Sequence, residues 1–331
     1  MNGETMARVR DRLSLTQQDF AAQLNKRLGR RYDKSKISRW ESGTEGIPAD
    51  VAGLLSIMQL SHAPTGKPVT VCVALQKGGV SKTLTSCGLS HILASAGARV
   101  LLVDCDSQAN STALVGLTET DVDRLARSSK TLYHALIAEP PTPATEAIQP
   151  TAIENLHVLP SSIHLARAEL KLNDGTEESK VRLRSVLDTV KDNFDFIILD
   201  TAPSLGLMTV SALAAADKVL IPVQCEAFAV TGLRHLRASI TEIRQRLNPG
   251  LSVLGILPTM YNPRQSQDKD SLIDIFKHAN GDKVFEPIPK STIYSQAAAG
   301  SRIVHDVDPG APGLASYIQI AEALGVANHG S

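Results

Sequence analysis

The chain has 331 residues, of which 43% are hydrophobic and 21% are charged, and its formal net charge is zero. This composition is that of a globular protein and excludes a disordered or fibrous chain, while the length suits a small domain followed by a larger one. The zero net charge also argues against a uniformly basic sleeve for nucleic acid.

The apolar runs are short. Examples are residues 100–103 and 196–199, far below the roughly 20 residues that a membrane-spanning helix needs. The first residues, MNGETMARVRDR, lack the pattern of a secretory signal. The four cysteines show no C-x-x-C pair and no metal-ligand spacing with histidine, which favours buried free thiols over a disulfide or zinc framework. We therefore expect a cytoplasmic protein without a membrane partner.

Basic residues are concentrated near the N-terminus. Between Arg8 and Arg39 there are ten Lys or Arg against three Asp, a local net charge of +7. Such a cluster attracts phosphate backbones, but it can equally be an ordinary solvated surface, and the charge alone does not decide between them.

Residues 1–60 are predicted to form short helices. Thr16 can cap one helix, with Asp19 three residues later, and Gly29 can end it. A second helix starts near Asp33 or Ser35, buries Ile37 and Trp40, and ends near Gly43. Two short helices joined by a turn with a glycine are typical of a helix-turn-helix.

The segments LTQQDFAAQL (15–24) and KISRWESG (36–43) resemble the Cro/CI-like class of phage repressors, although the first helix is about one turn longer than usual. The resemblance implies that the second helix enters the major groove of DNA. Its DNA-contacting residues would be Lys34, Ser35, Lys36 and Arg39. The alternative is a small helical bundle with no role in DNA binding.

Residues 61–67 (SHAPTGK) are predicted to be a linker, and residues 68–331 a second domain. In that domain, short β-branched or aliphatic runs alternate with helix-length segments. The runs are 69–75, 98–104, 156–160, 194–200, 217–223 and 251–257. This alternation predicts an α/β fold, a mainly parallel sheet with helices on both faces. The proline-rich stretch 139–151 is predicted to be an irregular surface loop.

The segment QKGGVSKT (76–83) lies between the first predicted strand and a helix that starts near Thr83. A glycine-rich turn at this place can wrap its backbone N–H groups around a triphosphate. The residues from Lys77 to Leu84 would then surround the phosphates: Lys77, Gly78, Gly79, Val80, Ser81, Lys82, Thr83 and Leu84. Lys82 would contact the β- and γ-phosphates, and the Thr83 hydroxyl would bind Mg²⁺.

The segment departs from the standard P-loop pattern, because Gln76 and Ser81 stand at its two glycine positions. It resembles instead the deviant Walker A motif, K-G-G-x-G-K-[ST], of the ParA/MinD group of ATPases, with Ser81 as the one departure. That resemblance implies a homodimer with ATP, in which Lys77 of one subunit contacts the phosphates bound by the other. A serine with positive φ at position 81 would weaken nucleotide binding by about 1 kcal/mol or more.

Three later segments follow the order of the ParA family: VLLVDCDSQANST (100–112), FIILDTAPSLG (196–206) and VLIPVQCEAFAVTGL (219–233). By that resemblance, Asp106 positions the attacking water, Asp104 supports the Mg²⁺ shell and Asp200 holds the Mg²⁺ waters. Taken alone, each aspartate could simply cap a helix after a strand.

The resemblance to ParA spans about residues 68–327 and implies a base-binding segment around Ile288 and Pro289. It also implies non-specific DNA binding by basic residues on the C-terminal side, for which the candidates are Arg234, Arg237, Arg264, Lys290 and Arg302. Each of these could instead be ordinary solvated surface.

The leading expectation is therefore a weakly active, nucleoid-associated ATPase for DNA partition, switched off when a ParB-type partner stimulates hydrolysis. A nucleotide-responsive transcriptional repressor is the alternative, and the two roles can coexist. A MinD-like membrane ATPase would need a basic amphipathic tail, whereas the final residues, SYIQIAEALGVANHGS, contain no Lys or Arg.

Overall fold

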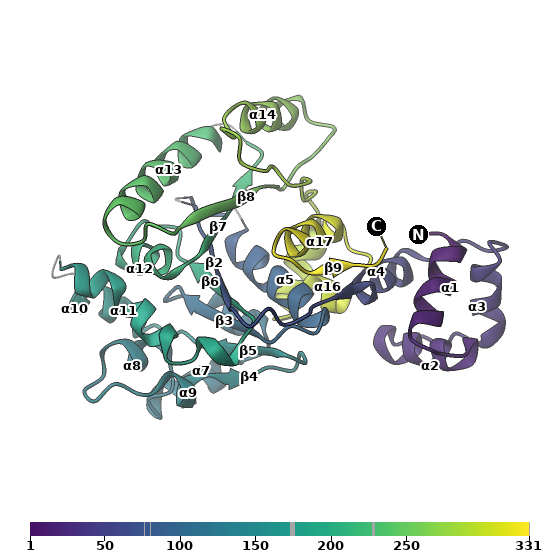
Figure 1. Cartoon of the computed structure of the whole chain (residues 1–331), viewed down its shortest axis with the longest axis horizontal. Coiled ribbons are helices and arrows are strands. Elements are labelled where there is room, and N and C mark those ends of the chain that lie inside the picture. The colour runs from purple at the N-terminus through teal and green to yellow at the C-terminus, as the bar shows by residue number, and fades with distance from the viewer. Residues whose placement is uncertain (76, 80, 173–175, 227–228, 331) are drawn as a thin grey trace.

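The computed structural model describes residues 1–75, 77–79, 81–172, 176–226 and 229–330. Helices α1 to α4, here called the N-terminal unit, come first; α1, α2 and α3 lie to one side, and α4 lies between them and the rest (Figure 1). Their bounds are α1 Gly3–Arg12, α2 Gln17–Leu28, α3 Lys34–Glu41 and α4 Ala49–Met58.

Side-chain caps fix where the first three helices begin. Asn2 accepts from the N–H of Thr5 at 2.9 Å, Thr16 from Asp19 at 3.1 Å, and Asp33 from Lys36 at 2.7 Å. Gly29 ends α2 in the left-handed conformation, with φ of 63°. The two helices predicted in this region are therefore confirmed as α2 and α3.

The N-terminal unit has a hydrophobic core of its own. Seven of its side chains, drawn from all four helices, are completely buried: Met6, Phe20, Leu24, Ile37, Trp40, Val51 and Leu55. Trp40 is the only tryptophan of the chain, so its environment reports on this core alone.

A seven-stranded sheet, in the described residues, forms the centre of the remainder, with the order β4-β5-β3-β6-β2-β7-β8. Only β4 runs antiparallel to its neighbour. The bounds are β2 Val69–Val73, β3 Val100–Cys105, β4 Gln149–Pro150, β5 Leu156–Leu159, β6 Phe196–Thr201, β7 Lys218–Gln224 and β8 Ser252–Thr259. All six predicted strands are confirmed.

The strands are buried on both faces. Leu101 and Val103 of β3 point into one core, and Val100 and Leu102 into the other. The first core is covered by α8 Leu132–Ile137, α9 Ala144–Ala147, α10 Leu165–Leu172, α11 Glu177–Asp188, α12 Leu207–Ala215, α13 Ala229–Arg246 and α14 Ser266–Lys277. The second is covered by α5 Lys82–Ser95, α6 Asn110–Leu114, α15 Thr292–Ala299, α16 Val304–Val307 and α17 Leu314–Ala323 (Figure 1). Helix α7 Glu119–Arg127 and the short helix η1 Lys191–Asn193 lie between these elements in sequence.

The prediction of an irregular loop over 139–151 was wrong in part. This stretch contains the one-turn helix α9 and the short strand β4. The reason is that Ala144 and Ala147 are buried against the core on one face of the sheet, a contact that the four prolines of the stretch gave no sign of.

The first residue of the segment predicted as a linker, 61–67, is part of a β-strand. Residues Leu60–Ser61 form strand β1, which pairs antiparallel with β9 Ala327–Asn328. None of the helices in the described ranges is both long and apolar enough to cross a membrane.

Candidate nucleotide site

The carboxyl ends of β2, β3 and β6 meet at one edge of the sheet. Asp104, in β3, and Asp200, in β6, are direct register partners, and Val73 of β2 is the partner of Asp200 on the other side. Ligands of parallel α/β sheets bind at this edge. The glycine-rich segment leaves β2 there and leads directly into α5.

The described part of the glycine-rich segment is open. At Gly78 and Gly79, an added Cβ would meet no described heavy atom within 4 Å, and Gly79 has a φ of 77°. Such a turn lets a phosphate approach the backbone closely. Gln76 and Val80, which belong to the predicted motif, lie outside the described residues.

Ser81 stands immediately before α5 in the left-handed conformation, with φ of 66° and ψ of 28°. This is the backbone geometry that glycine adopts without cost and that other residues adopt at a cost of about 1 kcal/mol. The positive φ that would make serine unfavourable at this position is therefore present.

Lys82 begins α5 and is only 6% exposed. Its Nζ donates to the carbonyl oxygen of Lys77 at 2.7 Å. Burial lowers the pKa of Lys82, and the charges of Asp200 and Asp106 oppose that shift. The ammonium group thus lies between the glycine-rich segment and the two aspartates Asp106 and Asp200. A phosphate bound there would form a charge-assisted hydrogen bond with it.

Asp104 is buried and held by three donors: the Thr112 hydroxyl at 2.7 Å, the Thr112 N–H at 2.9 Å and the Asp106 N–H at 3.1 Å. Burial nonetheless raises its pKa. These bonds fix the start of the segment that carries Asp106, so Asp104 acts here as an anchor for that segment.

Asp200 is also buried, and the Ser86 hydroxyl donates to its Oδ1 at 2.9 Å. Its Oδ2 has no hydrogen-bond partner among the described residues. Burial, and next the charge of Asp104, raise the pKa of Asp200 to about 7, while nearby hydroxyl groups, including that of Thr83, act against the rise. An orphaned carboxylate oxygen in such a place calls for a cation or a proton.

The residues present fit a magnesium ion. The unpartnered Oδ2 of Asp200 and the neighbouring Thr83 hydroxyl are hard oxygen donors, the type that Mg²⁺ prefers. The described residues hold no cluster of three His, Cys, Asp or Glu side chains, as expected for an ion that keeps several waters and binds through a single carboxylate plus substrate phosphates.

Two adjoining cavities open at this edge. One, of about 550 Å³, is lined by Gly78, Gly79, Lys82, Thr83 and Asp106, among others. The other, of about 650 Å³, is lined by Ile288, Pro289 and Tyr294. The two cavities share lining residues: Ser81, Thr83, Leu84, Asn110 and Met260.

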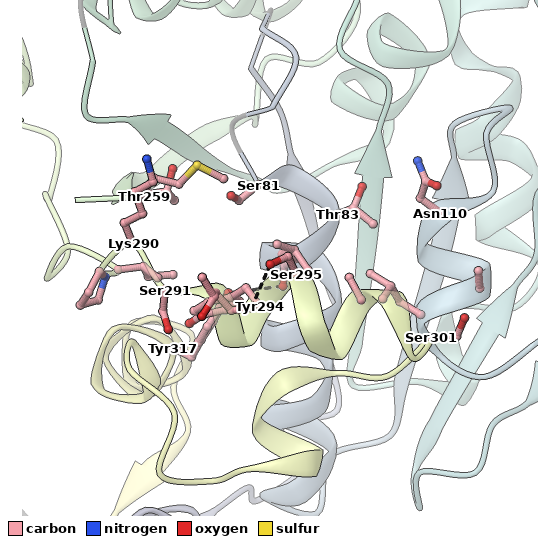
Figure 2. A pocket seen from close by; sticks show the side chains of 18 residues that line it. Ser81, Thr83, Asn110, Thr259, Lys290, Ser291, Tyr294, Ser295, Ser301 and Tyr317 are labelled. Atoms are coloured by element: carbon pink, nitrogen blue, oxygen red, sulfur yellow. Dashed lines mark hydrogen bonds between the residues drawn. The ribbon is translucent and has the colours of Figure 1, made fainter. Parts of the chain in front are cut away.

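The two cavities differ in chemistry. In Figure 2, Ser81 and Thr83 lie at the start of α5, while Lys290, Ser291 and Tyr294 border the cavity from the segment around α15. A glycine and lysine wall suits phosphates, and the more apolar wall at Ile288 and Pro289 suits a flat ring system. Together the two walls have the chemistry to hold a nucleoside triphosphate.

Asp106 lines the first cavity and is partly buried. Its Oδ1 accepts from the N–H of Gln108 at 3.0 Å. The carboxylate is therefore oriented by its own loop and has capacity left to accept a hydrogen bond from a water in the cavity.

Lys77 points to a different partner from the other residues of the loop. Its Nζ forms an ion pair with Oε1 of Glu226, which follows β7 in the same chain. The two side chains are 32% and 37% exposed. A pair with this exposure contributes about 0–1 kcal/mol, so the contact can be exchanged for a stronger one.

The basic residues expected to bind DNA through the second domain belong to several different elements. Arg234 and Arg237 belong to α13, which covers one face of the sheet, whereas Arg302 precedes α16, on the other face. Arg237 pairs with Asp282, and Arg302 pairs with Asp306 at 2.9 Å.

The remaining candidates on this domain differ in position. Arg234 contacts His278 at 3.0 Å. Arg264 is exposed in the loop after β8. Lys290 lines the same cavity as Ile288 and Pro289, the predicted base-binding residues.

In the N-terminal unit, Lys34, Ser35 and Arg39 are exposed on α3. Lys36 and Arg39 both pair with Glu45, the latter at 3.2 Å, and the Lys36 ammonium lies 5.6 Å from the centre of the Trp40 ring. Glu45 thus covers part of the positive charge that this helix would offer to DNA.

Several residues of the site were not predicted. Ser86, one helical turn after Lys82, and Thr112 bind the two buried aspartates. Glu226 was within a quoted segment but had no assigned role. The i, i+4 spacing of Lys82 and Ser86 was a usable signal, and Thr112 follows Asp104 by only eight residues, whereas Glu226 is far from Lys77 in sequence.

Comparison with known families gives one matching family model, described as an AAA domain, over residues 69–253. Its start coincides with β2. The sporulation initiation inhibitor protein Soj of Bacillus subtilis is 38% identical over 255 residues, covering 77% of this chain and 97% of Soj. The chromosome partitioning protein ParA of Caulobacter vibrioides is 35% identical over 257 residues, covering 77% and 92%.

Among solved structures, apo McdA of Cyanthece has a TM-score of 0.68 at 25% identity, over 77% of this chain and 99% of McdA. Cobyrinic acid a,c-diamide synthase of Mycobacterium smegmatis, solved with a bound ATP analog and magnesium, has a TM-score of 0.60 at 33% identity, over 71% and 91%. The predicted class of sheet is therefore confirmed by both the topology and these similarities.

Proposed function

This chain belongs to the ParA/Soj-type family of P-loop ATPases, and on that premise we propose that it is an ATP-dependent DNA-segregation ATPase. In this proposal ATP and Mg²⁺ close two copies into a homodimer, and the dimer binds DNA non-specifically. A ParB-type partner then stimulates hydrolysis and ends the bound state. The protein would work in the cytoplasm, on the nucleoid.

One observation carries the proposal. Lys82, Thr83 and Asp106 line one cavity at the carboxyl edge of the sheet, and the buried Asp200 of β6 lies beside Lys82 and Thr83. The structures of two similar proteins, one a complex with ATP and one with an ATP analog and magnesium, support ATP and Mg²⁺ as the ligands here.

The residues divide the chemistry among them. Lys82 would neutralise the β- and γ-phosphates, and the backbone of Gly78 and Gly79 would surround them. Thr83 and Asp200 would hold Mg²⁺, with Asp104 supporting its shell; the ion supplies charge neutralisation to the phosphates. Asp106 would orient the attacking water rather than act as a strong base, so slow intrinsic hydrolysis is expected.

The remaining assignments extend the same site. Ser81 and Leu84 would line the phosphate end, together with Val80, whereas Ile288 and Pro289 would contact the base. Lys77 would leave Glu226 and reach the phosphates bound by the other copy. Non-specific DNA would be held by basic residues of the second domain: Arg234, Arg237, Arg264, Lys290 and Arg302. Lys34, Ser35, Lys36 and Arg39 of α3 would contact DNA in the major groove.

The test is the variant Lys82→Ala in a filter-retention assay with non-specific duplex DNA. ATP-dependent retention should be lost, because the phosphates lose their main cationic partner. The control is Lys130→Ala, which changes an exposed lysine that lines neither cavity. This variant should retain DNA normally. Retention by Lys82→Ala equal to that of the unchanged protein would exclude the nucleotide switch.

A second candidate function is a nucleotide-responsive transcriptional repressor. The capped pair α2 and α3, with Lys34 and Ser35 exposed on α3, favours it. A short, sequence-specific footprint that persists without nucleotide would support this role. A footprint of no defined sequence, present only with ATP, would contradict it.

A further inference from the structure

The N-terminal unit is joined to the rest of the protein by more than the chain between them. Strand β1, directly after α4, pairs with β9 near the other end of the chain, with Leu60 opposite Asn328. The pairing continues outward, since the N–H of His329 donates to the carbonyl of Gln59 at 3.1 Å. The Ser61 hydroxyl adds a contact of 2.7 Å to the His329 ring.

The backbone of helix α4 is also in direct contact with the backbone of residues 309–310, which precede α17. A Cβ added to Gly53 would lie 1.9 Å from the carbonyl oxygen of Pro309. A Cβ added to Gly310 would lie 2.6 Å from the carbonyl carbon of Ala49. Two backbones in such reciprocal contact form a specific interface, because either glycine, replaced, would force them apart.

The hydrophobic residues of α4 are divided between two cores. Val51 and Leu55 belong to the core of the N-terminal unit, whereas Ile57, and Leu60 just after the helix, belong to a core beneath the sheet. A single helix therefore contributes side chains to the cores of both units. Moving one unit against the other would expose apolar surface, at a cost of roughly 1.5–3 kcal/mol for each such side chain.

The attachment ends on the helix that starts at the phosphate loop. The N–H of His62 donates at 2.8 Å to the carbonyl of Ala96, the C-cap of α5. The His62 side chain is 4% exposed, with its ring 5.1 Å from that of Phe196 in β6. Helix α5 therefore begins at Lys82 and, at its other end, holds the chain that leaves the N-terminal unit.

We propose that the N-terminal unit is fixed on the domain that carries the nucleotide site. In the ATP-bound homodimer, the two α3 helices are then presented at a single separation and orientation. The DNA partner of that surface is a duplex with two half-sites at one defined spacing, related by a two-fold axis like the subunits. A monomer engages one half-site only. This inference rests on the homodimer and on the DNA role of α3 proposed above.

Attachment by a flexible linker would have a different consequence. Two reading helices on flexible linkers accept many half-site spacings, because the linker takes up the difference. Fixed attachment accepts one spacing and adds the two binding energies, so the ATP-bound dimer gains sequence specificity that the monomer lacks.

The first experiment tests the attachment within one chain and needs no dimer. All four native cysteines are buried, so Ala22→Cys on α2 and Ser185→Cys on α11, both exposed, provide the sites for spin labels. Pulsed electron spin resonance on the nucleotide-free protein should give one narrow distance distribution. A broad distribution would overturn the proposal, whatever the protein does with ATP.

The second experiment disturbs the interface. Gly53→Leu should broaden the distance distribution, whereas Gly46→Leu, at an exposed glycine where a Cβ meets no described atom within 4 Å, should leave it narrow. Trp40 fluorescence shows whether the N-terminal core is intact in each variant. Should Gly53→Leu unfold that core, Gly310→Leu applies the same disturbance from the other side of the interface. A narrow distribution in a folded variant of this contact would contradict the proposal.

The third experiment tests the DNA partner. A library of random duplexes is selected by the full chain with Mg²⁺ and a slowly hydrolysed ATP analog, while light scattering records the oligomeric state. The expected product is a two-fold symmetric pair of half-sites at one spacing. A dimer that selects single or variably spaced sites would overturn the proposal, whereas failure to dimerise would refute the proposed function and leave the distance measurement as the test of attachment.

Discussion

The ammonium group of Lys77 is paired with the carboxylate of Glu226 in the same chain. The lysine that is expected to contact the ATP of the other subunit is thus paired within its own chain in the absence of that ATP. The variant Glu226→Gln removes this competitor, and we expect the ATP concentration needed for dimerisation to fall by up to about fivefold, the equivalent of 1 kcal/mol. Analytical ultracentrifugation across an ATP titration measures it.

The control is Glu242→Gln, which breaks a comparably simple pair with Arg246 on the surface of α13. It should leave the titration unchanged. If both variants behave alike, or if Glu226→Gln hinders dimerisation, then the pair does not restrain Lys77.

The variant Ser81→Gly should stabilise the phosphate loop. Glycine adopts the φ of 66° found here without strain, which favours the folded state by up to about 1 kcal/mol, less the extra freedom that glycine gives the unfolded chain. Isothermal titration should show tighter binding of ATP. Ser129→Gly, at a φ of 59° outside the lining of either cavity, relieves similar strain and should leave ATP affinity unchanged.

Asp200 should make stability and magnesium binding depend on pH in opposite directions. Its pKa is about 7 in the fold against 3.8 as the ordinary value. Between these values the folded protein holds a proton that the unfolded chain has lost, so the stability of the nucleotide-free protein falls as pH rises from about 4 to 7. Calorimetry should show this fall, of roughly a few kcal/mol, and Asp200→Asn should reduce it.

Magnesium requires the ionised carboxylate, so its binding with ATP should tighten as pH rises through about 7. Asp200→Asn should weaken that binding and remove most of its pH dependence. If Mg²⁺ binding by this variant kept its full pH dependence, another group would be taking up the proton. The first candidate for that group is Asp104, whose pKa is also raised.

Glu45 should limit the affinity of α3 for DNA. In Glu45→Gln, Lys36 and Arg39 lose their common partner and become available to phosphates. Affinity for duplex DNA in fluorescence anisotropy should rise, and the logarithmic salt dependence should steepen by about one for each additional phosphate contact. Glu4→Gln, beside Arg8 on α1, is the control and should change neither quantity.

The sequence was informative where the signal is local. Apolar runs located the six strands, and single residues such as Thr16 and Gly29 located the ends of α2 because caps act on neighbouring backbone groups. The glycine-rich segment and the acids at the carboxyl ends of β3 and β6 converge because parallel strands place these ends at one edge.

The contacts that remained unpredicted join distant segments. Nothing near Leu60 indicates that it will pair with Asn328, and nothing near Lys77 indicates Glu226. Helix α4 carries apolar residues on all sides, a pattern that shows burial without showing that two different cores are involved. The acidic partner of Arg237, Asp282, is likewise distant in sequence, whereas Arg302 pairs with Asp306 only four residues later, a local spacing that the prediction did not take into account.

The division of α4 between two cores has a practical consequence for studying the pieces separately. A fragment of residues 1–61 would expose Ile57 and Leu60 to water and lose β9, the strand that pairs with residues 60–61. Such a fragment has exposed apolar side chains and an unpaired β-strand, and it would tend to aggregate. Poor behaviour of this fragment would then say nothing about how well the helices bind DNA within the intact molecule.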